Sequence, residues 1–175
     1  MTYHPGRLEQ LVAVCGLAVG DRLRESAESA SEQEGCGPAA LVHLCAHPSG
    51  SIRDLQSVIG LTQTGTGRLV ERLVNAGLVE RRAGPDARTQ SLWLTVAGEA
   101  RAELLLRRRR EVMELLLEPL TGEERADLER LLGRVVGGLA YDRSTALSVC
   151  RLCDRSACRS GPGCPLEHTT RDAEL

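Results

Sequence analysis

Apolar residues recur at intervals of three and four along most of this 175-residue chain. In the segment 8–29 the positions that follow this spacing are Leu8, Leu11, Val12, Cys15, Val19 and Leu23. The spacing predicts an amphipathic helix. A polar break at 31–37 follows it. Pro38, which suits a first helical turn, then precedes a short apolar helix over 39–46.

Two short amphipathic helices come next. Ser51 is a good N-cap, and Asp54 three residues later makes a loose capping box. The apolar residues on one face of the first helix are Ile52, Leu55, Val58 and Ile59. Gly60 ends this helix, Thr62 caps a second one that runs to about residue 76, and Gly77 ends that one.

The segments 78–82 and 90–95 have the residue types of strands, and they flank a turn-rich tip at 83–89. Two long helices, 96–117 and 121–141, follow them. Two short helices joined by a glycine-containing turn and followed by a β-hairpin are typical of a winged helix-turn-helix. The predicted fold class is therefore mainly α with a small β-hairpin.

The composition is that of a globular protein, with 42% hydrophobic and 26% charged residues. The apolar run at 11–19 is too short to span a bilayer, and no clear cleavage site follows it, so a cytoplasmic location is expected. No paired acid/base constellation and no phosphate-binding loop is recognisable, so we do not expect an enzyme. The net charge of -2 gives no reason to expect nucleic-acid binding. The stretch from residue 60 to residue 90, however, contains five arginines and only three acidic residues, so its net charge is positive.

The second short helix would lie in the major groove of DNA. Its outward N-terminal face offers Thr62, Gln63, Thr64, Gly67 and Arg68, residues that suit base edges and phosphates. Further contacts are expected from Arg72, one turn later, and from the arginines of the hairpin, Arg82 and Arg88. The run of arginines at 107–110 points all round a helix, so we read it as a solvated face paired with nearby glutamates rather than as a second DNA patch.

The segments Leu61-Thr62-Gln63-Thr64, 68–73 and 76–81 resemble the recognition helix and first wing strand of the MarR family of transcriptional regulators. The segments 85–88 and 92–98 resemble its wing and the start of the next helix. The resemblance covers roughly residues 8–142 and implies that Asp86 orders the wing while Arg88 reaches the minor groove. It also implies a homodimer on a palindromic operator, and often a small-molecule effector. Gly65 and Gly67 are unfavourable inside the predicted recognition helix, because each glycine destabilises a helix by about 0.5–1 kcal/mol relative to alanine.

The resemblance implies a dimerisation helix at 1–35, a DNA-binding domain at 36–97 and further dimerisation helices at 98–142. The clustered cysteines beyond it predict a fourth segment, a cysteine-rich metal-binding tail at 143–175. We therefore expect a sequence-specific DNA-binding regulator, more specifically a repressor. The alternative is a winged-helix protein–protein interaction module with a structural zinc tail and no affinity for DNA.

Four of the seven cysteines lie close together, with the spacing C-x2-C-x4-C-x5-C: Cys150, Cys153, Cys158 and Cys164. Four thiolates in a short segment are able to surround one metal ion, and so small a segment has almost no core to bury. Zinc is favoured slightly over an iron–sulfur cluster. An unmetallated tail or disulfides formed on oxidation are the alternatives. Cys15 and Cys45 are expected in core packing.

Overall fold

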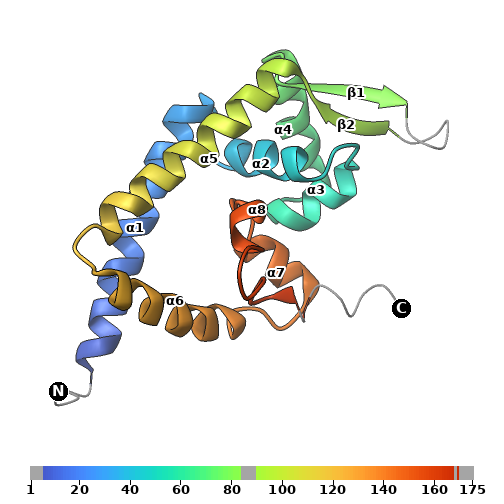
Figure 1. Cartoon of the computed structure of the whole chain (residues 1–175). Coiled ribbons are helices and arrows are strands. Elements are labelled where there is room, and N and C mark those ends of the chain that lie inside the picture. The colour runs from blue at the N-terminus through green and yellow to red at the C-terminus, as the bar shows by residue number, and fades with distance from the viewer. Residues whose placement is uncertain (1–5, 84–89, 168, 170–175) are drawn as a thin grey trace.

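We describe a computed structural model of the chain over residues 6–83, 90–167 and 169. The elements in chain order are the helices α1 (Arg7–Ser31), α2 (Gly37–Ala46), α3 (Ile52–Ile59) and α4 (Gln63–Asn75), the strands β1 (Val79–Ala83) and β2 (Gln90–Leu94), and the helices α5 (Val96–Leu117), α6 (Gly122–Gly137), α7 (Arg143–Val149) and α8 (Arg155–Cys158). Figure 1 shows their arrangement. The predicted fold class, mainly helical with one two-stranded antiparallel hairpin, is confirmed.

Local sequence signals set the start and end of the two helices before the hairpin. Ser51 and Asp54 form the expected capping box at α3, with Asp54 N donating to Ser51 Oγ at 3.1 Å and Ser51 N donating to Asp54 Oδ2 at 2.9 Å. Gly60 and Gly77 follow the helices with φ of 68° and 70°, a conformation that favours glycine. Their geometry turns the chain from α3 into α4 and from α4 into β1.

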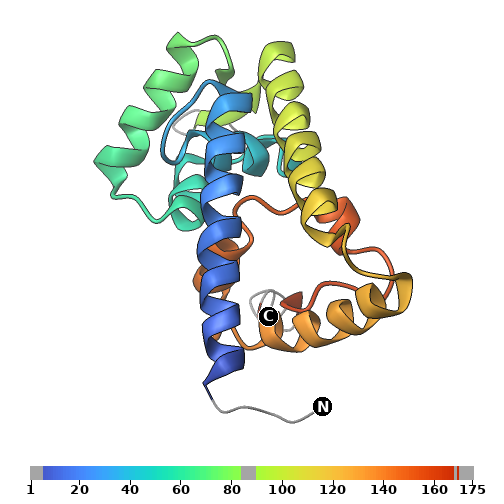
Figure 2. The ribbon, with the colours of Figure 1, turned by 90° about the vertical axis from the view of Figure 1, so that its left-hand side faces the viewer.

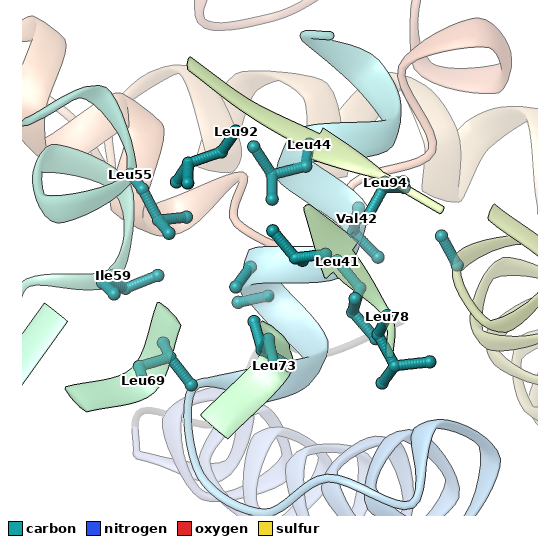
Figure 3. Close-up of a cluster of buried hydrophobic side chains, with 14 of the residues drawn as sticks. Leu41, Val42, Leu44, Leu55, Ile59, Leu69, Leu73, Leu78, Leu92 and Leu94 are labelled. Carbon is teal, nitrogen blue, oxygen red and sulfur yellow. The ribbon is translucent and has the colours of Figure 1, made fainter. Parts of the chain in front are cut away.

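The hairpin closes over these helices. β1 and β2 pair antiparallel from Val79 opposite Leu94 to Ala83 opposite Gln90. Leu92 N also donates to Gly50 O at 2.9 Å, which joins β2 to the turn before α3. The side chains buried between α2, α3, α4 and the hairpin are aliphatic, as the near absence of aromatic residues requires, and include Leu41, Leu44, Leu55, Leu73 and Leu92 (Figure 3). Their burial fixes α4 on the rest of the unit.

The two long helices α1 and α5 lie side by side along the molecule, as both Figure 1 and Figure 2 show. Contact is made toward the end of α1, where Ala27, Ala30 and Ser31 are buried and Arg101 Nη1 donates to Ala30 O at 3.2 Å. The first part of α1 is exposed within a single chain, and α6 buries no residue. Cys15 is exposed too, so the expectation that it packs in the core is wrong; Cys45 is half-buried against the core as expected.

The C-terminal segment differs most from the sequence-based expectation. α6 ends at Gly137 rather than near residue 141, and the segment after it forms α7 and α8, which return to the winged-helix unit near α3 (Figure 1). Ala140, Ala146 and Leu166 form a small buried cluster, while Leu147 and Leu152 pack against the main core. The expectation that this segment has almost no core is therefore wrong, because it shares the core of the winged-helix unit.

No helix in the described residues is both long and apolar enough to cross a membrane.

Candidate DNA-binding surface and cysteine cluster

One face of α4 is buried and the opposite face is open. Thr66, Leu69, Val70 and Leu73 are buried against α3 and the hairpin. Thr62 begins the helix by accepting a hydrogen bond from Gly65 N on its Oγ1 at 3.1 Å. This places the predicted residues of the first turns together on the exposed side, with Thr62, Gln63, Thr64 and Arg68 exposed and Gly67 half-exposed.

The arginines near this face are not equally available. Arg68 has no hydrogen-bond or ion-pair partner among the described residues. Arg72, in contrast, donates to Glu34 O at 3.3 Å, so its guanidinium is directed toward the segment before α2. An arginine without a partner keeps its five donors for a base edge or a phosphate. Arg68 is therefore the arginine of α4 best suited to contact DNA.

The arginines on the strands of the hairpin form ion pairs with glutamates of the same chain. Arg81 pairs with Glu71 of α4 at 2.6 Å. Arg82 pairs with Glu80, and its guanidinium carbon lies 4.5 Å from the centre of the Trp93 ring. These pairs stiffen the base of the hairpin beside α4. The predicted wing residues Asp86 and Arg88 lie outside the described residues.

The four clustered cysteines come together at one cavity. Cys150 caps the end of α7, Cys158 is the last residue of α8, and Cys153 and Cys164 lie in the connecting segments. All four are half-buried and line a cavity of about 90 Å³. All seven cysteines are free thiols, so the structure contains no disulfide among them.

The thiols influence each other's ionisation. The Cys153 thiol is hydrogen bonded to Cys150, which lowers the pKa of Cys150 and raises the pKa of Cys153. Burial, together with Cys153 and Cys164 nearby, raises the pKa of Cys158 to about 12. In the part of the chain that the structure describes, no three Cys, His, Asp or Glu side chains are already arranged to hold a metal ion. The metal site stays a prediction that rests on the donor set, four thiols at one cavity.

Two histidines of the winged-helix unit complete the wall of this cavity. The His43 and His47 rings lie 4.8 Å apart, centre to centre. Burial, and then the neighbouring His47, lowers the pKa of His43 to about 4. Burial, and then Arg155, lowers the pKa of His47, whose Nε2 contacts the Arg155 guanidinium. Sequence reasoning did not identify this pair; the only signal is the four-residue spacing that puts both rings on one side of a helix end.

The comparisons with known proteins agree with this geometry. A sequence model described as MarR family matches residues 39–89, from α2 to the hairpin. The structure of RV1404 from Mycobacterium tuberculosis is similar to this chain with a TM-score of 0.71 and 22% identity, over 81% of this chain and 98% of its own. Wild-type MarR from E. coli is similar with a TM-score of 0.57 and 25% identity, over 77% and 98%. The chain has the winged-helix fold of the MarR family.

A third structure with this fold is MepR, titled a transcription regulator of the Staphylococcus aureus multidrug efflux pump MepA, with a TM-score of 0.63 and 18% identity over 79% of this chain and 100% of its own. No curated protein sequence matches this chain. The MarR fold accounts for about four-fifths of the chain, and the four clustered cysteines lie beyond the residues that the family model matches. Their chemistry has to be argued from this chain alone.

Proposed function

We propose that this protein is a DNA-binding transcriptional regulator that places α4 in the major groove, with the β1–β2 hairpin beside it. The observation that carries the proposal is the exposed first part of α4, where Gln63, Thr64 and Arg68 stand on the face opposite the core. Gln is able to bond both polar atoms of an adenine edge, and Arg those of a guanine edge. A helix held rigidly by a buried opposite face keeps such side chains in place for base contacts.

The regulator works as a homodimer in this proposal. Dimerisation is typical of the MarR family, and α1 and α6 expose apolar side chains that a second copy of the chain would cover. A two-fold symmetric dimer reads two half-sites about one helical turn apart, which gives a palindromic operator. MepR, with the same fold, is titled a transcription regulator, and this supports the same class of function here, with repression as the mode we propose.

The input that regulates DNA binding is proposed to reach the cavity lined by the four cysteines. A metal or a change of redox state would act on the thiols, and a small-molecule effector would occupy the same cavity beside His43 and His47. Arg155 and α7 join this cavity directly to the winged-helix unit. A structural change at this cavity would therefore act directly on the elements that position α4.

The test uses duplexes that the protein selects from a random-sequence pool, and measures affinity by fluorescence anisotropy at several salt concentrations. Arg68→Ala should weaken operator binding by about 1–3 kcal/mol, or about 5- to 150-fold, because it removes one base or phosphate contact. Arg107→Ala is the matched control: Arg107 is an exposed arginine of α5 without a partner among the described residues. Circular dichroism should show that both variants keep the fold.

Two results would contradict the proposal. If no sequence is enriched from the pool and binding lacks the steep salt dependence of phosphate contacts, the unit is a protein–protein interaction module instead. If Arg68→Ala and Arg107→Ala reduce the affinity equally, DNA is bound by nonspecific electrostatic attraction to the protein surface and not by base contacts from α4. Arg88→Ala tests the wing in the same assay, with a loss of about 1–3 kcal/mol expected from the family resemblance.

A further inference from the structure

The segment 142–167, which we call the cysteine segment, contacts α6, where Val136 packs on the cluster of Ala146 and Leu166, and it also contacts the winged-helix unit and α5. α7 packs against α3, and Leu147 and Leu152 contact the main core. Arg155 contacts His47 at the end of α2. Asp154, whose side chain is only 14% exposed, accepts from Arg110 Nη2 of α5 at 3.2 Å. The segment therefore bridges the winged-helix unit and the long helix α5.

Short-range contacts bend the cysteine segment around its cavity. Asp154 begins α8 by accepting from Ser156 N at 3.1 Å and Ala157 N at 3.2 Å, and Cys153 N donates to Cys150 O at 2.9 Å. Gly161 and Gly163, with φ of 68° and 91°, turn the chain back so that Cys164 lines the same cavity as the other three. Four thiols from two helix ends and two loops thus reach one place.

Apart from Leu147 and Leu152, which are partly buried on the main core, the segment buries only Ala146 and Leu166, in a small cluster with Ala140 of the chain before it. So little burial contributes modestly to holding a segment of this length, because ordering each residue has an entropic cost. A metal that binds four side chains spread over fifteen residues would supply the missing cross-links. The cavity also has three arginines in its wall, Arg151, Arg155 and Arg159. Their three positive charges balance the charge of −2 that four thiolates leave around a divalent ion, together with the negative charge of Glu167 in the same wall.

We infer that Cys150, Cys153, Cys158 and Cys164 bind one thiolate-coordinated metal centre, and that this centre fastens the winged-helix unit to α5. The shared chemistry is four deprotonated sulfurs, with Zn²⁺ or an iron–sulfur cluster as the two candidate centres. On binding Zn²⁺, each thiol gives its proton to solvent and each sulfur forms one bond to the ion, without any change of oxidation state. The four side chains must converge from their positions around the cavity to reach the Zn–S distance of about 2.3 Å.

The second half of the inference rests on the proposed DNA-binding function. α3 packs against α4, so a cysteine segment fixed by metal holds α3, and through it α4, in one position relative to α5. Loss of the metal releases this restraint, and DNA binding then has to order the segment again. We expect the metal-free protein to bind its operator at least about fivefold more weakly, the lower end of typical coupling between two sites.

The metal site is tested on the full chain purified without oxygen, by elemental analysis, sulfide determination and visible absorption. We expect one metal centre per chain. A colourless protein with zinc assigns Zn²⁺, and a coloured protein with iron and sulfide assigns the cluster. Cys153→Ser and Cys164→Ser should each lose the centre, while Cys15→Ser, at an exposed cysteine outside the segment, should keep it. A wild-type chain that carries no metal and takes up no added Zn²⁺ overturns the site, as does full retention of the centre in both cluster variants.

The coupling is tested on the selected operator with metal-loaded wild type, the chelated wild type, the same sample after the metal is restored, and Cys153→Ser. A loss of affinity on chelation that reloading reverses supports the inference, and it does so even if Cys153→Ser fails to fold. Equal affinity of loaded and metal-free protein overturns the coupling but leaves the DNA-binding proposal intact. If no duplex is bound in any state while the metal is present, the DNA-binding proposal fails and the metal site stands.

Discussion

At the scale of single residues, two glycines stand in the helix proposed to read DNA. A Cβ at Gly67 would meet no heavy atom within 4 Å, whereas at Gly65 it would come within 3.3 Å of the Thr62 hydroxyl that caps the helix. Gly67 is therefore not needed for packing inside the described chain. Since glycine costs a helix about 0.5–1 kcal/mol relative to alanine, another role has to account for it. Four residues after Gln63, it lies on the face offered to DNA.

We predict that Gly67→Ala raises the free energy of unfolding by about 0.5–1 kcal/mol and at the same time weakens operator binding. The added methyl group would hold the helix backbone away from the floor of the groove. Urea denaturation and anisotropy on the same sample measure the two effects. Gly122→Ala at the exposed first residue of α6, where a Cβ also meets open space, should leave the affinity unchanged. A Gly67→Ala protein that is more stable and binds DNA as tightly as wild type would remove the argument for close approach.

At the scale of elements, the hairpin and α5 approach each other closely where they join. Thr95 begins α5, accepts from Gly98 N at 3.1 Å and donates its hydroxyl to Gly77 O at 2.6 Å. A Cβ at Gly98 would lie 2.0 Å from the Leu78 carbonyl oxygen, which is backbone and has no side-chain freedom to move away. α5 therefore meets the backbone of Leu78, the residue before β1, at a distance that only glycine allows.

We predict that Gly98→Ala destabilises the protein by about 1–3 kcal/mol or more, because the joint must open to admit the methyl group. Thermal and urea unfolding followed by circular dichroism measure the loss. The usual effect of Gly→Ala in a helix has the opposite sign, so the direction alone decides the test. A Gly98→Ala protein as stable as wild type would show that α5 and the hairpin are not joined this closely.

Some of the helices and strands could be predicted from the sequence, and others could not. Caps and periodic apolar faces act within a few residues, so α3, α4, the hairpin and the full span of α5 follow from Ser51, Thr62, Gly77 and their neighbours. The helix α7 and its place beside α3 do not. α7 packs against α3, which lies more than eighty positions earlier in the chain, and no short-range pattern carries that information.

The candidate site divides in the same way. The exposed position of Gln63, Thr64 and Arg68 follows from helical periodicity, because Leu69 and Leu73 fix the buried face. The contact of Arg72 with Glu34 O, and of Arg155 with His47, depends on tertiary packing that residue spacing does not contain. The four cysteines were recognisable as a group from their spacing, but their place against the winged-helix unit was not.

At the scale of the whole molecule, a single chain leaves much apolar surface uncovered. In the first part of α1, Leu11 and Leu17 are 54% and 72% exposed, and in α6, Leu131 and Leu132 are 48% exposed each. α1 packs on α5 only toward its end, and Figure 2 shows its other end and α6 extending away from the winged-helix unit. Apolar faces on two helices at one end of the molecule are typical of an interface with a second copy.

We predict that the wild-type chain is a dimer at micromolar concentration, with twice the chain mass of 18.9 kDa by light scattering. The double variant Leu17→Glu, Leu131→Glu should be monomeric, because a dimer would have to bury both carboxylates without partners. Val96→Glu, at an apolar residue of α5 that is 85% exposed and outside these faces, should leave the mass unchanged. A monomeric chain would place only one α4 on the DNA, so the double variant should also lose most of its operator affinity while keeping the helical content of the wild type. A wild-type protein that is already monomeric at this concentration would contradict the prediction and leave the apolar faces of α1 and α6 without the partner assigned to them.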